Sequence, residues 1–283
     1  MLVLLVACRA AGSHPAGPVV VVDDAGDTTR LAAPAGRIVS LSPTTTELLF
    51  AIGAGVRLVG RTHWDDFPPR ARSVPDVGDA MPPNIEAVLA RRPDLVLLYH
   101  SAQNATAARR FRDAGAAVLQ LRMDRLEDVP RLARLLGPLV GAPDAADSLA
   151  DAFGRALAAA TDTAGTGAPG VLLLAWDQPP IAIGAGSFQS EILRRAGGRN
   201  IYSDLPSPSA TVSLESIVAR DPDLILVTDS APPAFAGRPE WQSVRAVREH
   251  RFLHFTNPAF ARPGPRSPEV IRELRAALQR AVP

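Results

Sequence analysis

The sequence predicts an α/β protein of two lobes, each built on a mainly parallel sheet, with one long helical connection between them. Three observations predict this fold class: short apolar strands alternate with helices, one internal repeat places a copy in each half, and a helical stretch separates the halves. Strands this apolar must be covered on both faces, as parallel sheets are by flanking helices. A chain of 283 residues suits two such lobes better than one core.

The alternation divides the chain into four predicted segments. These are a leader and tether (residues 1–18), an N-terminal α/β lobe (19–124), a bridging helical region (125–165) and a C-terminal α/β lobe (166–283).

The N-terminal lobe is predicted to open with a hairpin over residues 19–31, because a run of valines is followed by a turn-forming cluster and a second short strand. A buried strand at 37–41 then leads into a helix that Ser42-Pro43 begins and Gly53 ends. The bridging region is predicted to be helical from Leu126 to Ala160, with breaks around Gly137 and at residues 141–143.

The internal repeat aligns residues 84–98 with residues 213–227 without gaps, and seven of the fifteen positions are identical. Each copy begins with an N-cap residue, Asn84 or Ser213, and carries a carboxylate in the first helical turn, Glu86 or Glu215. In each copy a proline ends the helix before a buried strand. The repeat therefore predicts two lobes of similar construction.

Composition excludes some classes of function. The formal net charge is only +1, whereas a nucleic-acid-binding protein needs dense basic patches to neutralise phosphates. No apolar stretch reaches the roughly 18 residues that a membrane-spanning helix requires.

The single cysteine, Cys8, follows an apolar opening and Leu5-Val6-Ala7. This arrangement resembles the lipobox of bacterial lipoprotein signal peptides, in which the cysteine is lipidated and becomes the first mature residue. The alternative is a short cleaved secretory signal with an incidental cysteine. Both predict a location outside the cytoplasm, and the first predicts a membrane-anchored lipoprotein.

Four segments together resemble the periplasmic binding proteins that serve ABC importers of vitamin B12, siderophores and haem. They are RIVSLSPTTTELLFAIG at residues 37–53, VGRTHWDDFP at 59–68, AGGRNI at 196–201 and RPGPR at 262–266. The resemblance runs in order from about residue 19 to 281, and it is strongest to the cobalamin-binding members. It implies a class III periplasmic-binding-protein fold: two Rossmann-like lobes bridged by a single long helix, with the ligand in the cleft between them.

The resemblance also implies which residues line the cleft. Trp64 and Tyr99 match aromatic positions of the N-terminal lobe, although a tyrosine at the end of a strand could instead pack on its own lobe. In the C-terminal lobe Trp176 ends a strand, and Ile181 lies in the predicted loop Pro179-Pro180-Ile181. Large chelates need such aromatic and apolar walls together with a few polar groups.

Phe260 and Arg262 match a stretch of the family in which an aromatic residue and an arginine approach the ligand, whereas Arg266 is predicted to be structural. Ala80, Ser209 and Pro258 stand near positions where the best-known cobalamin binders have tryptophans or an acidic residue. These departures leave open a different corrinoid, a ferric siderophore or haem. The Tyr99-His100 pair could ligate haem iron.

In the same family a carboxylate on each lobe pairs with arginines of the permease, and Glu86 and Glu215 match these positions. The alternative role of both is to stabilise a helix N-terminus, worth about 0.3–1 kcal/mol. The predicted partners are therefore an ABC permease dimer with its ATPase and a small metal-chelate ligand, and the protein is predicted to be monomeric.

The sequence does not predict catalytic activity. The five histidines lack the spacing and carboxylate companions of a zinc site, and no resident cofactor or metal is expected. Residues 184–187 resemble a dinucleotide-binding turn but lack its third glycine. The competing class, an α/β enzyme with an active site between the lobes, has no cofactor or nucleophile motif to support it.

Overall fold

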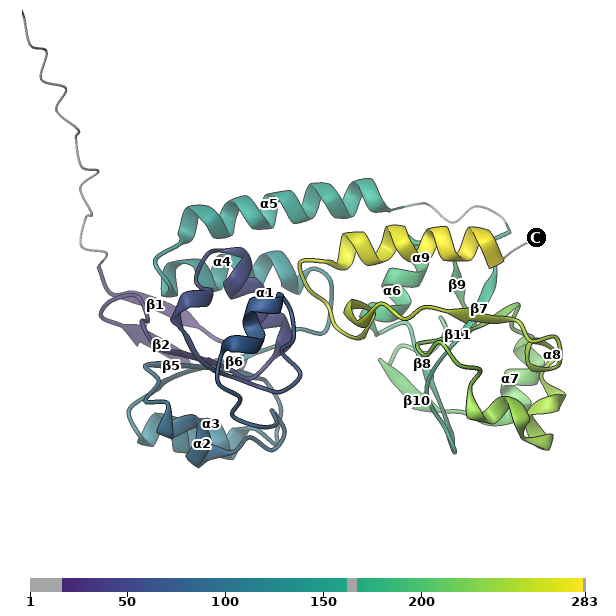
Figure 1. Cartoon of the computed structure of the whole chain (residues 1–283), viewed down its shortest axis with the longest axis horizontal. Helices are drawn as coiled ribbons and strands as arrows, with labels where there is room; N and C mark the ends of the chain where they lie inside the picture. The colour runs from purple at the N-terminus through teal and green to yellow at the C-terminus, as the bar shows by residue number, and fades with distance from the viewer. Residues whose placement is uncertain (1–16, 162–166, 282–283) are drawn as a thin grey trace, which may run out of the picture.

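The computed structural model describes residues 17–161 and 167–281, and Figure 1 shows two lobes side by side with helix α5 above them. Cys8 and most of the predicted leader lie outside the described residues.

The N-terminal lobe contains a parallel four-stranded sheet in the order β4-β3-β5-β6 and a separate antiparallel hairpin, β1-β2. Its strands are β1 (Val19–Val22), β2 (Thr28–Leu31), β3 (Ile38–Ser40), β4 (Leu58–Arg61), β5 (Leu95–Tyr99) and β6 (Ala117–Leu121). Its helices are α1 (Pro43–Ala51), α2 (Ile85–Ala90) and α3 (Ala105–Asp113). Helices α4 (Asp128–Leu139) and α5 (Pro143–Ala160) follow.

Alternate residues of these strands point to opposite faces of the sheet, and both faces are buried. Leu95 and Leu97 of β5 pack with α1, α4 and α5, whereas Val96 and Leu98 pack with α2 and α3. A strand that buries side chains on both faces reads as a continuous apolar run, which is why the sequence predicted a covered parallel sheet.

The C-terminal lobe is a mixed sheet in the order β10-β8-β7-β11-β12, with the short β9 paired to β7. Its strands are β7 (Gly170–Asp177), β8 (Pro180–Ile183), β9 (Arg199–Asn200), β10 (Ser209–Thr211), β11 (Leu224–Val227) and β12 (Phe252–His254). Its helices are α6 (Phe188–Arg195), α7 (Leu214–Arg220), α8 (Arg245–Arg248) and α9 (Ser267–Ala281). Helices α6 and α9 cover one face, and α7 and α8 cover the other.

Two local predictions are wrong. Pro180 and Ile181 are not in a loop, because Pro180 begins β8, which pairs antiparallel with β7 and β10, and only Pro179 lies in the turn before it. Gly137 does not break a helix, because α4 continues through it to Leu139. A Cβ on Gly137 would lie 2.5 Å from the Cβ of Ala146, so this glycine allows α4 and α5 to pack closely.

The lobes are joined by α5 and by side chains that cross between them. Figure 1 shows α5 running from above the N-terminal lobe to a position beside α9, which it contacts. Leu126, just before α4, and Ala160, at the end of α5, are both buried in the core of the C-terminal lobe. The predicted two-lobed α/β fold with a helical bridge is therefore confirmed.

Candidate ligand-binding cleft

A hollow of about 470 Å³ lies between the lobes and is lined by both of them. The N-terminal lobe contributes the end of β5 and the segment after β6, and the C-terminal lobe contributes the start of α6 and the segment before β10. This is the carboxyl-end position at which open α/β sheets bind ligands. The lining residues are Tyr99, Met123, Asp124, Arg125, Ile183, Gly186, Ser187, Phe188, Gln189, Pro206, Pro208 and Ser209.

Tyr99, at the end of β5, lines the hollow on the N-terminal side and is the aromatic residue of that wall. Its phenolic hydroxyl donates a hydrogen bond to Oδ1 of Asp124 at 2.7 Å. Burial, and then the Asp124 carboxylate, raise the pKa of Tyr99 to about 12, so the phenol is neutral at physiological pH. His100 is not among the residues that line the hollow.

On the C-terminal side the cleft deepens into a smaller hollow of about 130 Å³, and the two share Ile183 and Gln189. The middle of β7 and the carboxyl end of β11 line this inner part, together with Phe235 and Phe260. Phe260 is only 2% exposed, because its ring packs edge-to-face on Phe255 at 5.5 Å between centroids. It forms part of the cleft wall but does not project into the cleft.

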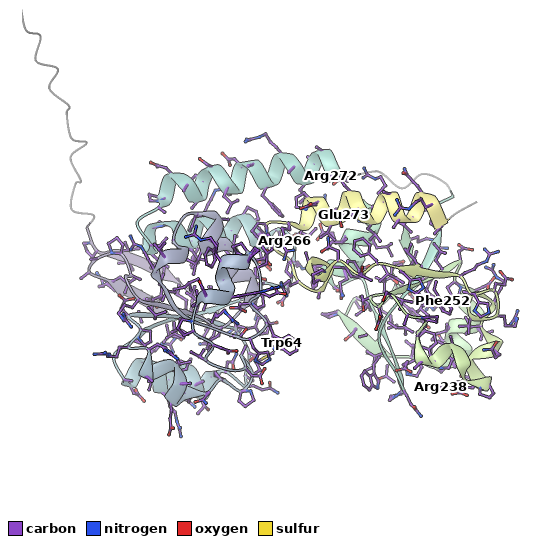
Figure 2. All side chains as sticks on the ribbon, viewed as in Figure 1. Trp64, Arg238, Phe252, Arg266, Arg272 and Glu273 are labelled. Atoms are coloured by element: carbon purple, nitrogen blue, oxygen red, sulfur yellow. The ribbon has the colours of Figure 1, made fainter. Side chains whose placement is uncertain are left out.

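Trp64 and Trp176 lie outside both hollows and are largely exposed, at 62% and 59%. Trp64 follows β4, and its indole Nε1 donates to Oδ1 of Asp79 at 3.2 Å. Figure 2 shows it on the side of the N-terminal lobe that faces the other lobe. Trp176 lies opposite Ile181 in the β7–β8 hairpin, where its Nε1 donates to the Gln178 carbonyl at 2.8 Å. Each lobe thus carries one exposed tryptophan.

Arg262 does not project freely toward the cleft. Its guanidinium is 2.9 Å from Oδ1 of Asp66 and 3.3 Å from Oε1 of Glu47, and both carboxylates belong to the N-terminal lobe. Arg266 binds Glu47 as well, which agrees with the structural role predicted for it. Glu47 was missed from the sequence, although a carboxylate in the otherwise neutral helix 43–51 was a signal that it needs a cationic partner.

Glu86 and Glu215 are both exposed in the first turns of α2 and α7. The preceding caps are formed as predicted: the Asn84 side chain accepts from the backbone N–H of Ala87, and Ser213 accepts from that of Ser216. Hydrogen bonds from its own backbone and from Ser213 lower the pKa of Glu215, so its charge is retained at neutral pH. Figure 1 shows α2 and α7 away from α5, one on each lobe.

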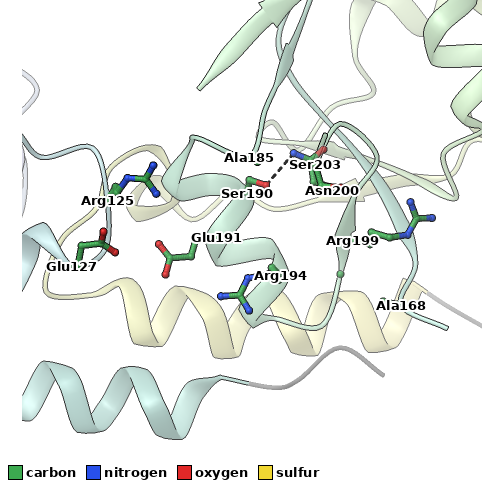
Figure 3. A pocket seen from close by; sticks show the side chains of 11 residues that line it. Arg125, Glu127, Ala168, Ala185, Ser190, Glu191, Arg194, Arg199, Asn200 and Ser203 are labelled. Carbon is green, nitrogen blue, oxygen red and sulfur yellow. Dashed lines mark hydrogen bonds between the residues drawn. The ribbon is translucent and has the colours of Figure 1, made fainter. Parts of the chain in front are cut away.

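A larger hollow, of about 620 Å³, lies on the flank of the C-terminal lobe around α6 (Figure 3). Its wall includes Arg125, Glu127, Glu191, Arg194 and Arg199 and contains no aromatic side chain. Polar and charged walls of this kind do not suit a large conjugated ring, so size alone does not make it the ligand site.

Within residues 17–161 and 167–281, no group of three or more histidine, cysteine or acidic side chains is placed to hold a metal ion. The same residues include no helix that is long and apolar enough to span a bilayer.

Two lobes, a helical bridge and a cleft lined by both define a two-lobed ligand-binding protein. The sequence profile of the family described as periplasmic binding protein matches residues 38–259. The chain belongs to this family. The matched proteins are binding proteins, which confirms the prediction that the chain is not an enzyme.

Individual relatives agree with this assignment. A vitamin B12-binding protein from Pectobacterium carotovorum is 28% identical over 234 residues, which cover 81% of this chain and 83% of that protein. The uncharacterized ABC transporter substrate-binding lipoprotein YvrC of Bacillus subtilis is 30% identical over 270 residues, covering 92% and 85%.

Solved structures superpose on most of the chain. The haem-binding protein RhuT from Roseiflexus, in apo form, gives a TM-score of 0.78 at 25% identity and covers 87% of this chain and 99% of that one. The vitamin B12-binding protein BtuF of Vibrio cholerae gives a TM-score of 0.72 at 25% identity and covers 88% and 98%.

Proposed function

We propose that the chain is the substrate-binding component of an ABC importer, and that it captures cobalamin or a related corrinoid in the cleft between its lobes. The observation that carries this proposal is the hollow lined by both lobes, with Tyr99 and Met123 on one wall and Phe188, Pro206 and Pro208 on the other. Apolar and aromatic walls suit the faces of a macrocycle, and a few polar groups suit its rim.

Three polar side chains of the cleft suit a corrinoid, and its two charged residues are Asp124 and Arg125. Ser187, Gln189 and Ser209 are neutral donors and acceptors that suit the amides at the rim of a corrin. Haem would need an axial ligand for its iron. The Tyr99 phenol is a poor candidate for that ligand, because its raised pKa opposes the phenolate form. Haem and ferric siderophores remain the alternatives, since solved relatives are described as haem- and Fe³⁺-hydroxamate-related proteins.

A titration panel tests the ligand class. Purified protein is titrated with cyanocobalamin, haemin and a ferric hydroxamate, and binding is followed by visible absorbance and by quenching of tryptophan fluorescence. Trp241 is only 2% exposed in the C-terminal lobe, whereas Trp64 and Trp176 are exposed, so quenching reports mainly on Trp64 and Trp176. Saturable binding of cyanocobalamin alone supports the proposal. Saturable binding of haemin with a shifted Soret band, and none of cyanocobalamin, would refute it.

Delivery requires a membrane partner, and the two exposed carboxylates suit one. We infer that Glu86 and Glu215, one per lobe, pair with arginines of a permease dimer that its ATPase drives. Reversing both charges is expected to abolish uptake and to leave ligand affinity unchanged.

The matched control for that experiment is Asp144→Arg, because Asp144 is an exposed acid in the first turn of α5. This variant loses the same stabilisation of a helix N-terminus but not a docking charge. Uptake that survives reversal of both Glu86 and Glu215 would exclude the docking role.

The proposed location is extracytoplasmic, with Cys8 as the lipid attachment site and the receptor acting as a monomer. Metabolic labelling with a clickable fatty acid, compared between the natural chain and Cys8→Ser, tests the anchor. Label in both proteins would rule out Cys8 as its site.

A further inference from the structure

A buried carboxylate of one lobe is neutralised by arginines of the other. The Glu47 side chain, on α1, is only 4% exposed. Its two oxygens accept from Arg266, at 3.0 Å from Nε and 2.7 Å from Nη2, and Nε of Arg262 lies at 3.3 Å. Both arginines belong to the segment that leads into α9 of the C-terminal lobe, and Figure 2 shows Arg266 at the junction of the lobes. We call Glu47, Arg262 and Arg266 the junction cluster.

The segment after β4 extends the junction cluster on the N-terminal side. Asp66 accepts from Nη2 of Arg262 at 2.9 Å, so this arginine bridges two carboxylates. The guanidinium of Arg266 lies 3.8 Å from the centre of the Phe67 ring, close enough for a cation–π interaction. Neighbouring Asp65 is fully buried, and burial raises its pKa even though the Thr46 and Thr62 hydroxyls bind it.

A neutral hydrogen bond crosses the same junction, since the hydroxyl of Thr44 donates to the carbonyl of Pro263 at 2.8 Å. Every contact of the junction cluster described above joins the two lobes. A buried charge that loses its partner is left uncompensated, which is strongly destabilising. Moving the two partners of a buried ion pair apart has a similar cost, so such pairs hold their separation closely. The junction cluster therefore resists sliding or opening of one lobe against the other.

A second junction lies at the other edge of the N-terminal sheet. Leu126 follows β6, which ends the strand order on one side, and it is buried in the core of the C-terminal lobe with Ala160. Asp66 and Phe67 follow β4, which ends the strand order on the opposite side. Two anchors at opposite edges of one sheet prevent rotations that a single connecting helix would allow.

We propose that Glu47 is a positioning residue: through Arg262 and Arg266 it sets the separation of the lobes, and with it the width of the cleft, before any ligand arrives. Glu47 itself is buried and absent from the lining of the cleft, so it acts only through this geometry. The consequence for ligand affinity rests on the function proposed above, whereas the consequence for lobe separation does not.

Spin labels on the two lobes test the proposal. In a Cys8→Ser background, labels at Ala90→Cys on α2 and Ala219→Cys on α7, both exposed, give the distribution of distances between the lobes by pulsed dipolar spectroscopy. A single narrow distribution is expected for the natural cluster and a broad one for Glu47→Gln and for Arg266→Gln. If a fraction f of molecules keeps the original separation, the apparent Kd for cyanocobalamin rises by 1/f, about fivefold when f is about 0.2.

The matched control is Arg131→Gln, because Arg131 also bridges two carboxylates, Asp24 and Asp128, but joins α4 only to the N-terminal lobe on which α4 packs. It is expected to leave the distance distribution and the Kd unchanged. A narrow, unshifted distribution in both cluster variants would overturn the proposal, as would a broad distribution with an unchanged Kd. If the natural protein binds no cyanocobalamin, the proposed ligand fails while the distance measurement still decides the role of Glu47. Should Glu47→Gln not fold, Arg266→Gln, whose side chain is 19% exposed, decides alone.

Discussion

Trp64 lies outside the two hollows but on the side of its lobe that faces the C-terminal lobe, where a ligand larger than the hollow would cover it, so Trp64→Ala is expected to weaken binding without unfolding the protein. The side chain is 62% exposed, and a tryptophan presents about 150–250 Å² in all, which leaves roughly 90–150 Å² for a ligand to cover. At about 25 cal/mol per Å², covering all of it is worth about 2–4 kcal/mol and covering half about 1–2 kcal/mol. The Kd of Trp64→Ala for cyanocobalamin should therefore rise by at least about 5- to 30-fold.

Equilibrium titration followed by visible absorbance measures this change, and thermal unfolding checks the fold. Trp64 has little effect on stability, because its hydrogen bond to Asp79 is exposed and the ring buries little area. Trp64→Phe should fall between the natural protein and the alanine variant. Val56→Ala is the control, since Val56 is 80% exposed on the same lobe. A folded Trp64→Ala protein with an unchanged Kd would show that the ligand never covers this ring.

Three further results are expected. Leu126→Ala should lower the free energy of unfolding by about 2–4 kcal/mol, because truncating this fully buried side chain leaves a cavity in the C-terminal core. Urea unfolding followed by the fluorescence of the buried Trp241 measures this loss, and a loss below about 0.5 kcal/mol would argue against that packing. Tyr99→Phe should cost about 1 kcal/mol at pH 7, since it removes the hydrogen bond to Asp124. The pKa of Tyr99 is raised from 10.0 to about 12, so the stability that its neutral form contributes is fully present below pH 10 and is lost as the pH rises through 12. Urea titrations that show no such loss would contradict the raised pKa of Tyr99. Arginine at both Glu86 and Glu215 should stop uptake in cells while titration of the purified variant gives an unchanged Kd.

The repeat predicted its elements well because local rules define both copies. Each predicted N-cap is followed directly by its helix, α2 at residues 85–90 and α7 at residues 214–220, and each helix ends before the proline that precedes the buried strand. The position of Tyr99 at a strand end followed from the same rules, because carboxyl ends of parallel strands face the ligand side of a sheet.

The errors arose where tertiary contacts decide the structure. Pro179-Pro180 is typical of a loop, yet Pro180 needs no N–H to begin an antiparallel strand, and only its pairing with β7 and β10 makes β8 a strand. Gly137 is a weak helix former, but the absence of a side chain at this position allows Ala146 of the next helix to approach closely. The contacts of Arg262 were also not predicted, because its carboxylate partner Glu47 is 215 residues away and no pattern along the chain joins them.

The two cores also differ in what they need from the rest of the chain. The residues of the two N-terminal core clusters lie between Val19 and Leu157, whereas the C-terminal core includes Leu126 and Ala160. As the chain emerges from the ribosome or from an export channel, the first lobe can therefore complete its core before the second has appeared. It then offers the second lobe a ready-made apolar surface on which to nucleate. The charge of Glu47 stays unpaired until its two arginines have been made, 215 and 219 residues later in the chain.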